Sequence, residues 1–298
     1  MFKKIGALCM CIVIIALVCG CAKSDNKKPG VVATVFAEYD FARAVCGNKA
    51  DVRLLLLPGS DVHSYEPTFS DVVSINNASV FLYIGGESET WVEKILKSAN
   101  KDLITLKMAD TVPLLAEDDE PDEYDEHIWT SPENAKIMVN AICEKMCLAD
   151  PDNSQYFKQN AEDYCKKITA ADEKIKSVLK DVENPYIVVA DRFPLAYFAD
   201  YYGIGYSAAF AGCDADTDAD LLTVMHLIDD VKVHNLKVVY KIELSNGAVA
   251  KTVAESTGAA VEELHSAHNI SARDFAAGIT YADIMLNNAS ALERGFKK

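Results

Sequence analysis

The chain has 298 residues, half of them hydrophobic, and carries 29 basic against 45 acidic side chains for a formal net charge of −16. A body this acidic repels nucleic acid and anionic lipid headgroups, which argues against both as binding partners and favours cations. The length is sufficient for two ordinary domains, each with a hydrophobic core of its own.

Residues 1–20 predict a lipoprotein signal peptide. A basic start precedes an uncharged apolar run at 5–18, which is short for a membrane span and typical of a secretory signal. The run closes on small residues before Cys21 and resembles a bacterial lipoprotein cleavage signal, with Cys21 as the acylated first residue. An uncleaved helical anchor is the alternative, and either way the globular part lies outside the cytoplasmic membrane. Residues 21–30 predict a flexible tether.

Strand and helix patterns then alternate. Apolar runs are followed by amphipathic stretches and by Gly or Pro stops. The expected strands are Val31–Phe36, Asp51–Leu57, Val80–Ile84 and Leu103–Leu106, and the expected helices are Asp40–Cys46, Asp71–Asn76 and Glu89–Ala99. This alternation predicts βαβ units with a parallel sheet, in which ligands bind beyond the carboxyl ends of the strands.

Two histidines fall at the ends of predicted elements. His63 lies in the loop that follows Asp51–Leu57 and the Pro58-Gly59 turn, and His127 lies just before a helix that Ser131 caps. The acidic stretch Glu117–Glu126 leads directly into His127. It is either a charged surface loop or a region that gathers cations.

The longest helical pattern is Ser154–Val182, in which apolar residues recur at spacings of three and four. A helix of this length extends over roughly 40 Å, more than the width of one small domain. No second repeat accompanies it, so the pattern favours a single helix that joins two lobes over a coiled coil. Asn184-Pro185 ends it.

The second half repeats the alternation. Three acidic or basic side chains, Asp191, Glu243 and His265, follow directly on predicted strands. The expected strands are Tyr186–Ala190, Tyr206–Ala211, Val238–Ile242 and Val261–Leu264. The expected helices are Pro194–Tyr202, Asp216–Val231 with Leu221, Leu222, Met225, Leu227 and Ile228 inside, Ala248–Thr257 and Tyr281–Glu293.

Five cysteines remain outside the signal, and none forms a CxxC pair: Cys46, Cys143, Cys147, Cys165 and Cys213. They predict neither a disulfide framework nor a cysteine zinc site. Cys143 and Cys147, four residues apart on a predicted helix, are expected to be core residues.

Five segments together resemble the solute-binding lipoproteins of bacterial zinc/manganese ABC transporters, the cluster A-I metal-binding proteins. They are PGSDVHSYEPT around His63, YIGGESETWVEKIL at Tyr83–Leu96, HIWTSPENA at His127–Ala135, the helix after Asp150, and TYADIMLNNASAL at Thr280–Leu292. The resemblance covers nearly all of the mature chain in the family's order.

The resemblance implies an α/β fold of two lobes, each with a central, mostly parallel sheet flanked by helices, joined by one long rigid helix. The implied lobes are residues 31–150 and 184–298, with 151–183 as the linking helix. It further implies a metal clamped between the lobes, and its delivery to a membrane permease powered by an ATPase, while lipid on Cys21 holds the protein at the membrane.

Two of the family's four ligand positions carry over, to His63 and His127. At the third position, five residues before Tyr197, the chain has Arg192, which cannot coordinate a cation, so we assign the adjacent Asp191. The fourth position, usually an Asp before a Ser, is His265-Ser266 here. His268 and Glu243 are nearby alternatives.

Three imidazoles and one carboxylate suit Zn²⁺ in tetrahedral geometry, and the histidine in place of an aspartate favours Zn²⁺ over Mn²⁺. Each histidine must be neutral to ligate, so binding is expected to weaken as the pH falls through about 6.5. We expect a binding protein and not an enzyme. The rival interpretations are a zinc hydrolase with Glu66 or Glu243 as its base, and an adhesion lipoprotein in which the metal is structural.

Overall fold

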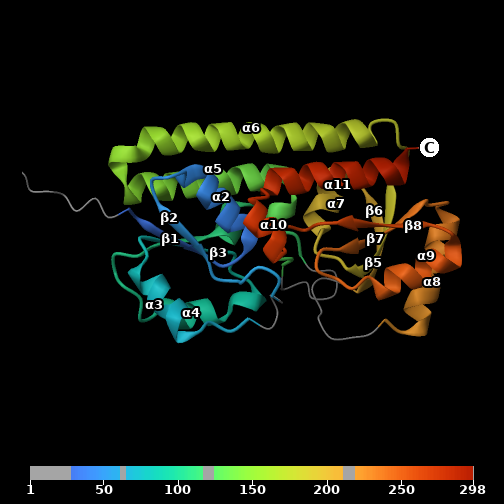
Figure 1. Ribbon diagram of the computed structural model, residues 1–298, viewed down its shortest axis with the longest axis horizontal. Coiled ribbons are helices and arrows are strands. Elements are labelled where there is room, and N and C mark those ends of the chain that lie inside the picture. The colour runs from blue at the N-terminus through green and yellow to red at the C-terminus, as the bar shows by residue number, and fades with distance from the viewer. Residues whose placement is uncertain (1–27, 61–64, 117–123, 211–218, 298) are drawn as a thin grey trace, which may run out of the picture.

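The computed structural model describes residues 28–60, 65–116, 124–210 and 219–297, and shows two lobes next to each other under a shared layer of helices (Figure 1). Each lobe contains a four-stranded parallel sheet. The predicted α/β fold with two lobes and one long helix is confirmed.

The first sheet has the strand order β2-β1-β3-β4. Its strands are β1 (Gly30–Ala33), β2 (Asp51–Leu54), β3 (Val80–Tyr83) and β4 (Ile104–Lys107). Side chains of β1 alternate between two cores, because successive residues of a strand point to opposite faces. Val31 packs in the core that contains α2 (Phe36–Cys46) and α5 (Pro132–Ala149), and Val32 packs with α3 (Phe69–Asn77) and α4 (Trp91–Leu96).

The second sheet repeats this plan with the order β6-β5-β7-β8. Its strands are β5 (Tyr186–Arg192), β6 (Gly205–Phe210), β7 (Val238–Ile242) and β8 (Ala260–Leu264). One face packs on α8 (Leu221–Val233) and α9 (Ala248–Thr257), and the other faces the core that contains α7 (Ala196–Tyr202) and α11 (Tyr281–Phe296).

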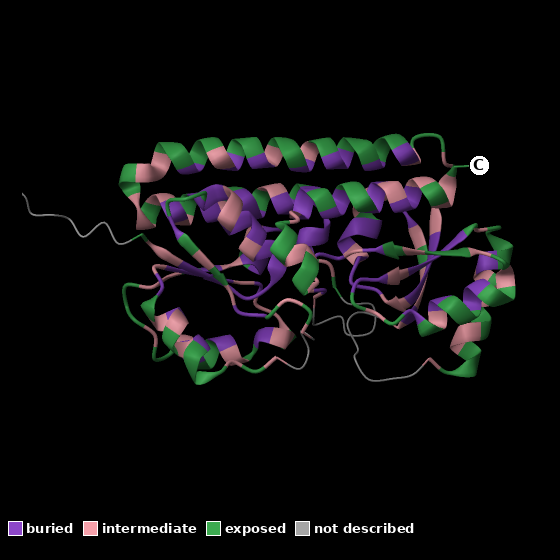
Figure 2. Cartoon of the chain, in the orientation of Figure 1, coloured by how far each residue is buried: buried purple, intermediate pink, exposed green. Residues whose placement is uncertain are grey.

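The long helix α6 (Ser154–Leu179) extends along both lobes and packs against both α5 and α11 (Figure 1). Its outer side is exposed and its inner side buried (Figure 2), as the apolar spacing predicts. The buried side chains include Phe157, Ala161, Tyr164, Ile168, Ala171, Ile175 and Val178. One continuous core therefore passes from lobe to lobe under this helix.

Helix α8 differs from the sequence prediction. Leu227 is buried, but Leu221, Leu222 and Met225 are 74%, 65% and 51% exposed. The prediction that these three lie inside is wrong. The first turns of this helix carry apolar side chains on more than one face, and only the face with Leu227 and Val231 meets the sheet. The short helix α10 (Ala272–Ala277) was also not predicted.

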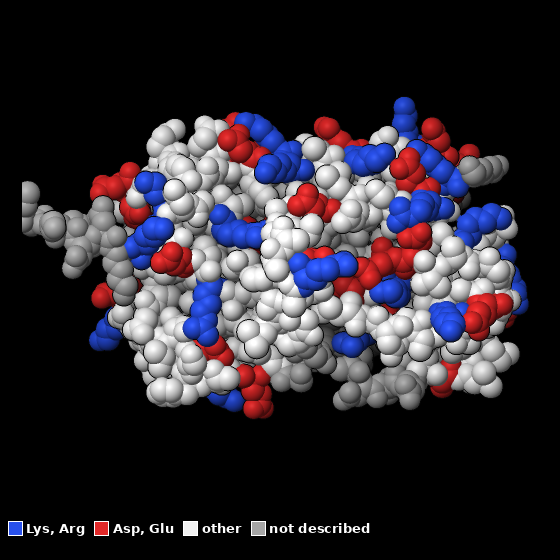
Figure 3. All heavy atoms as spheres, in the orientation of Figure 1, with Lys and Arg blue, Asp and Glu red and all other residues white. Residues whose placement is uncertain are grey.

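In the part of the chain that the structure describes, no helix combines the length and the apolar composition needed to cross a bilayer. The four cysteines described there, Cys46, Cys143, Cys147 and Cys165, are free thiols. Acidic side chains gather to the right of the middle of the face in Figure 3, with basic side chains around them.

Candidate metal centre

His127 is placed by the start of helix α5. A short 3₁₀ turn (Ile128–Thr130) separates it from Ser131, whose side chain accepts a hydrogen bond from the Asn134 backbone N–H, with Pro132 next in the chain. Both the cap and the proline position are as the sequence predicts. The His127 side chain is almost completely buried, at 3% exposure.

Asp125 orients the His127 ring. Its Oδ1 accepts the His127 backbone N–H at 2.7 Å and lies 3.1 Å from His127 Nδ1. A carboxylate only accepts hydrogen bonds, so Nδ1 carries the proton and Nε2 is the ring nitrogen with the lone pair. This carboxylate–histidine arrangement is the usual support of a metal-binding imidazole.

His268 brings a second imidazole to His127. The two ring centroids are 5.0 Å apart with planes at 80°, and Trp129 contacts both rings at 5.4 and 5.1 Å. His268 is also buried, at 7% exposure. It follows β8 of the second lobe, whereas His127 belongs to the first, so the pair spans the junction between the lobes.

Hydrogen bonds to its backbone carbonyls fix the segment around His268 against the first lobe. The His268 carbonyl accepts from the Phe36 N–H at 3.1 Å, and the Ser266 carbonyl accepts from Trp129 Nε1 at 2.7 Å. Between them Ala267 adopts a left-handed conformation with φ 62°. This turn, in a conformation that L-residues rarely adopt, sets the direction in which His268 leaves the strand end.

The neighbouring Asn269 reaches the loop that leads to His63. Its Nδ2 donates to the carbonyls of Leu57 at 3.1 Å and Ser60 at 2.6 Å. Residues 61–64 lie outside the described residues, so the predicted ligand His63 has no described position. Cys21, Cys213 and most of the acidic stretch, 117–123, lie outside as well.

His265 follows directly on β8 and lies in a different environment from His268. Its Nδ1 accepts the Ala267 backbone N–H at 2.9 Å and lies 3.7 Å from Glu243 Oε1. In a neutral imidazole the proton is then on Nε2, so in this arrangement neither ring nitrogen offers a free lone pair. Glu243 is itself held by the Ser266 N–H, at 2.8 Å, and by the Ser266 hydroxyl.

Asp191 lies half-buried near the end of β5, and its Oδ1 accepts the Arg192 backbone N–H at 3.0 Å. Among the described residues, no group of three or more His, Cys, Asp and Glu side chains is close enough to hold a metal ion. The ligand set of His63, His127, Asp191 and His265 therefore stays a prediction. The structure shows a contact between the rings of His127 and His268 that the sequence did not predict. It also shows Asp125 beside the His127 ring, which the Asp-x-His spacing before the helix could have indicated.

Comparison with known proteins identifies the family. The family model described as zinc-uptake complex component A, periplasmic (ZnuA), matches residues 31–295. The high-affinity zinc uptake system protein ZnuA of Bacillus subtilis is 29% identical over 314 residues, with 98% of each chain covered. The zinc-binding lipoprotein AdcA of Streptococcus pneumoniae is 29% identical, over 98% of this chain and 61% of AdcA.

Solved structures show the same fold. The Zn(II)-bound ZnuA-like domain of S. pneumoniae AdcA matches with a TM-score of 0.79 and 28% identity, covering 91% of this chain and all of that domain. The metal-dependent lipoprotein YcdH of B. subtilis matches with a TM-score of 0.80 and 29% identity, over 90% of this chain and 100% of that one. The chain belongs to the ZnuA family of periplasmic zinc-uptake components.

Proposed function

We propose that this protein is the extracytoplasmic solute-binding component of a zinc ABC transporter, which captures Zn²⁺ between its lobes and delivers it to a permease served by an ATPase. Its family and the zinc-binding relatives named above support this role. The observation that carries the proposal is the meeting of His127 from one lobe with His268 from the other.

The ligands we propose are His63 and His127 from the first lobe, with a histidine and the Asp191 carboxylate from the second. The sequence assigns His265 as the histidine of the second lobe. The contact with His127 favours His268 in that place, because the Nδ1 of His265 is already engaged by a backbone N–H. A set rich in imidazole favours Zn²⁺ over Mn²⁺, which prefers more oxygen ligands.

Four protein ligands would close the coordination sphere of Zn²⁺ and leave no position for a reactive water, which suits binding and release better than hydrolysis. We further propose that residues 31–150 and 184–298 act as the two clamping lobes, linked by 151–183. Cleavage after residue 20 and acylation of Cys21 would tether the protein to the outer face of the membrane through residues 21–30.

Isothermal titration of the metal-free chain with Zn²⁺ at neutral pH tests the proposal. We expect one tight equivalent in the wild-type chain and its loss in His127→Ala. The matched control is His226→Ala, since His226 is exposed on α8 and should leave the titration unchanged. No heat from the wild-type chain, or an identical titration for all three proteins, would contradict the proposed role.

A further inference from the structure

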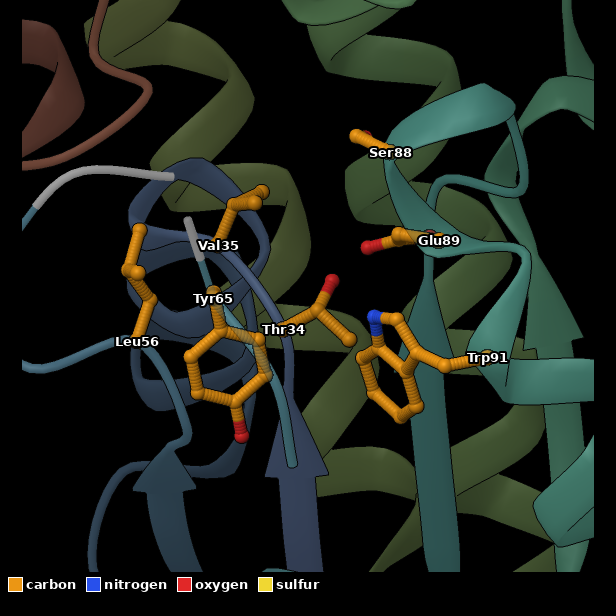
Figure 4. A pocket seen from close by; sticks show the side chains of 7 residues that line it. All are labelled: Thr34, Val35, Leu56, Tyr65, Ser88, Glu89 and Trp91. Carbon is orange, nitrogen blue, oxygen red and sulfur yellow. The ribbon is translucent and has the colours of Figure 1, made fainter. Parts of the chain in front are cut away.

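A small cavity lies at the carboxyl edge of the first sheet (Figure 4). Its wall includes Thr34 after β1, Leu56 after β2, and Glu89 and Trp91 after β3, with the ring of Tyr65 closing one side. In parallel sheets this edge is where ligands bind. The described candidates for zinc ligands, His127, Asp191, His265 and His268, do not line this cavity.

Glu89 is the charged group of the cavity. It is 6% exposed, and its Oε2 accepts the Gly85 backbone N–H at 2.7 Å. The other oxygen, Oε1, is buried without a hydrogen-bond partner. Figure 4 shows the carboxyl group extending into the cavity, toward the hydroxyl of Thr34.

A second buried carboxyl group, Glu38, lies next to Thr34. It is fully buried, and its Oε2 accepts both the Thr34 backbone N–H at 3.2 Å and the Thr34 hydroxyl at 2.9 Å. Its Oε1, like that of Glu89, has no hydrogen-bond partner. The unpartnered hydroxyl of Tyr65 points away from Glu89 and takes no part in this group.

The two carboxyl groups interact through space, and both are costly to ionise. Burial raises the pKa of Glu89 to about 7, and burial together with the charge of Glu89 raises the pKa of Glu38 well above its usual range. Thr34 has only one hydroxyl proton, which it donates to Glu38. An additional positive charge between the carboxyl groups would stabilise them, because each has an oxygen that no protein donor reaches.

We propose that this cavity is a second cation site, distinct from the cleft between the lobes, which takes a hard divalent cation such as Mn²⁺ or Ca²⁺ on oxygens of Glu89, Glu38 and Thr34. Carboxylate and hydroxyl oxygens are the ligands that hard cations prefer, and water completes their coordination sphere. The group has no imidazole or thiolate, so it lacks the ligand types that favour Zn²⁺ over hard cations.

Residues of the cavity wall connect it with the sequence around the histidines of the first lobe. Leu56 and Tyr65 stand on either side of the segment that contains His63. Ser88, also in the wall, donates its backbone N–H to Glu126 at 2.9 Å, next to His127 in the chain. A cation in the cavity is therefore placed beside the Ser88–Glu126 contact, which adjoins His127 in the chain.

Electron paramagnetic resonance of Mn²⁺ added to the full chain, first saturated with Zn²⁺, tests the site. We expect one bound Mn²⁺ per chain in the wild type, and at least tenfold weaker Mn²⁺ binding in Glu89→Gln and in Glu38→Gln. The matched control is Glu87→Gln, which removes an exposed carboxylate from the same 3₁₀ turn (Glu87–Glu89) and should bind Mn²⁺ as the wild type does. Ca²⁺ should displace the Mn²⁺.

A Zn²⁺ titration of each variant shows whether it is folded. The variant Glu89→Asp keeps the carboxylate and should retain part of the Mn²⁺ binding. Absence of bound Mn²⁺ in the zinc-loaded wild type, or equal binding in Glu89→Gln and Glu87→Gln, would overturn the second site. Because Zn²⁺ binding in the cleft is measured separately, these outcomes leave the proposed zinc role untouched. Loss of Zn²⁺ binding alone would overturn that role and leave this site standing.

Discussion

The imidazole of His127 meets that of His268 edge-on, with ring centroids 5.0 Å apart. The two residues are 141 positions apart in the chain and belong to different lobes. A cation bound by both would connect the lobes directly, so its affinity depends on how the lobes are held together as well as on the ligands themselves.

His268→Ala should lower the affinity for Zn²⁺ by more than about 100-fold, because it removes a ligand at the junction of the lobes. His265→Ala should have a smaller effect, since the His265 ring is engaged with the Ala267 N–H and lies beside Glu243. Competition with a calibrated zinc chelator measures both affinities. The reverse order of the two effects would return the ligand role to His265.

Asp125→Asn should weaken Zn²⁺ binding by about 10- to 100-fold, the usual effect of removing the carboxylate that supports a metal-binding histidine. The asparagine side chain can keep the hydrogen bond to the His127 backbone but no longer holds the Nδ1 proton with a full negative charge. The same chelator competition measures the loss. An unchanged affinity would mean that Asp125 only shapes the turn.

Much of the fold could be predicted because apolar runs alternate with amphipathic stretches, and because Ser131 and Pro132 mark the start of α5. The choice between His265 and His268 could not be predicted. It depends on the left-handed conformation of Ala267, and an alanine in the sequence does not indicate such a turn. The burial of Glu38 could not be predicted either, since an acidic residue near a helix start is normally exposed and favoured by the helix dipole.

Stability should depend on the protonation of Glu89. Its pKa is about 7 in the folded chain against 4.5 ordinarily, so the folded state holds a proton that the unfolded state has lost between these values. The free energy of unfolding should therefore fall as the pH rises from 4.5 to 7, by on the order of 2 kcal/mol from this group. Glu89→Gln should remove this pH dependence, and the variant should be more stable than the wild type at pH 8.

Urea unfolding at pH 5 and pH 8, in buffer with chelator and without divalent cations, measures the difference. Glu87→Gln is the control and should keep the pH dependence of the wild type, since Glu87 is exposed. If the free energy of unfolding of Glu89→Gln depended on pH as that of the wild type does, Glu89 would not cause the effect.

Asp40→Ala should lower the free energy of unfolding by about 3 kcal/mol, because it leaves several buried donors without an acceptor. Asp40 accepts the Tyr281 backbone N–H at 2.8 Å, the Arg43 Nε–H at 2.7 Å and the Tyr164 hydroxyl, and so joins α2, α6 and α11. Urea unfolding measures the loss. Glu162→Ala, which breaks an exposed ion pair with Lys166, should cost at most about 1 kcal/mol.

Anomalous scattering at the zinc absorption edge, from crystals of the Zn²⁺-loaded chain, would locate the bound zinc and identify its ligands. We predict one strong peak between the lobes, about 2.1 Å from Nε2 of His127, with a histidine of the second lobe among the other ligands. A zinc peak elsewhere on the molecule, or one bound by residues of a single lobe, would contradict it.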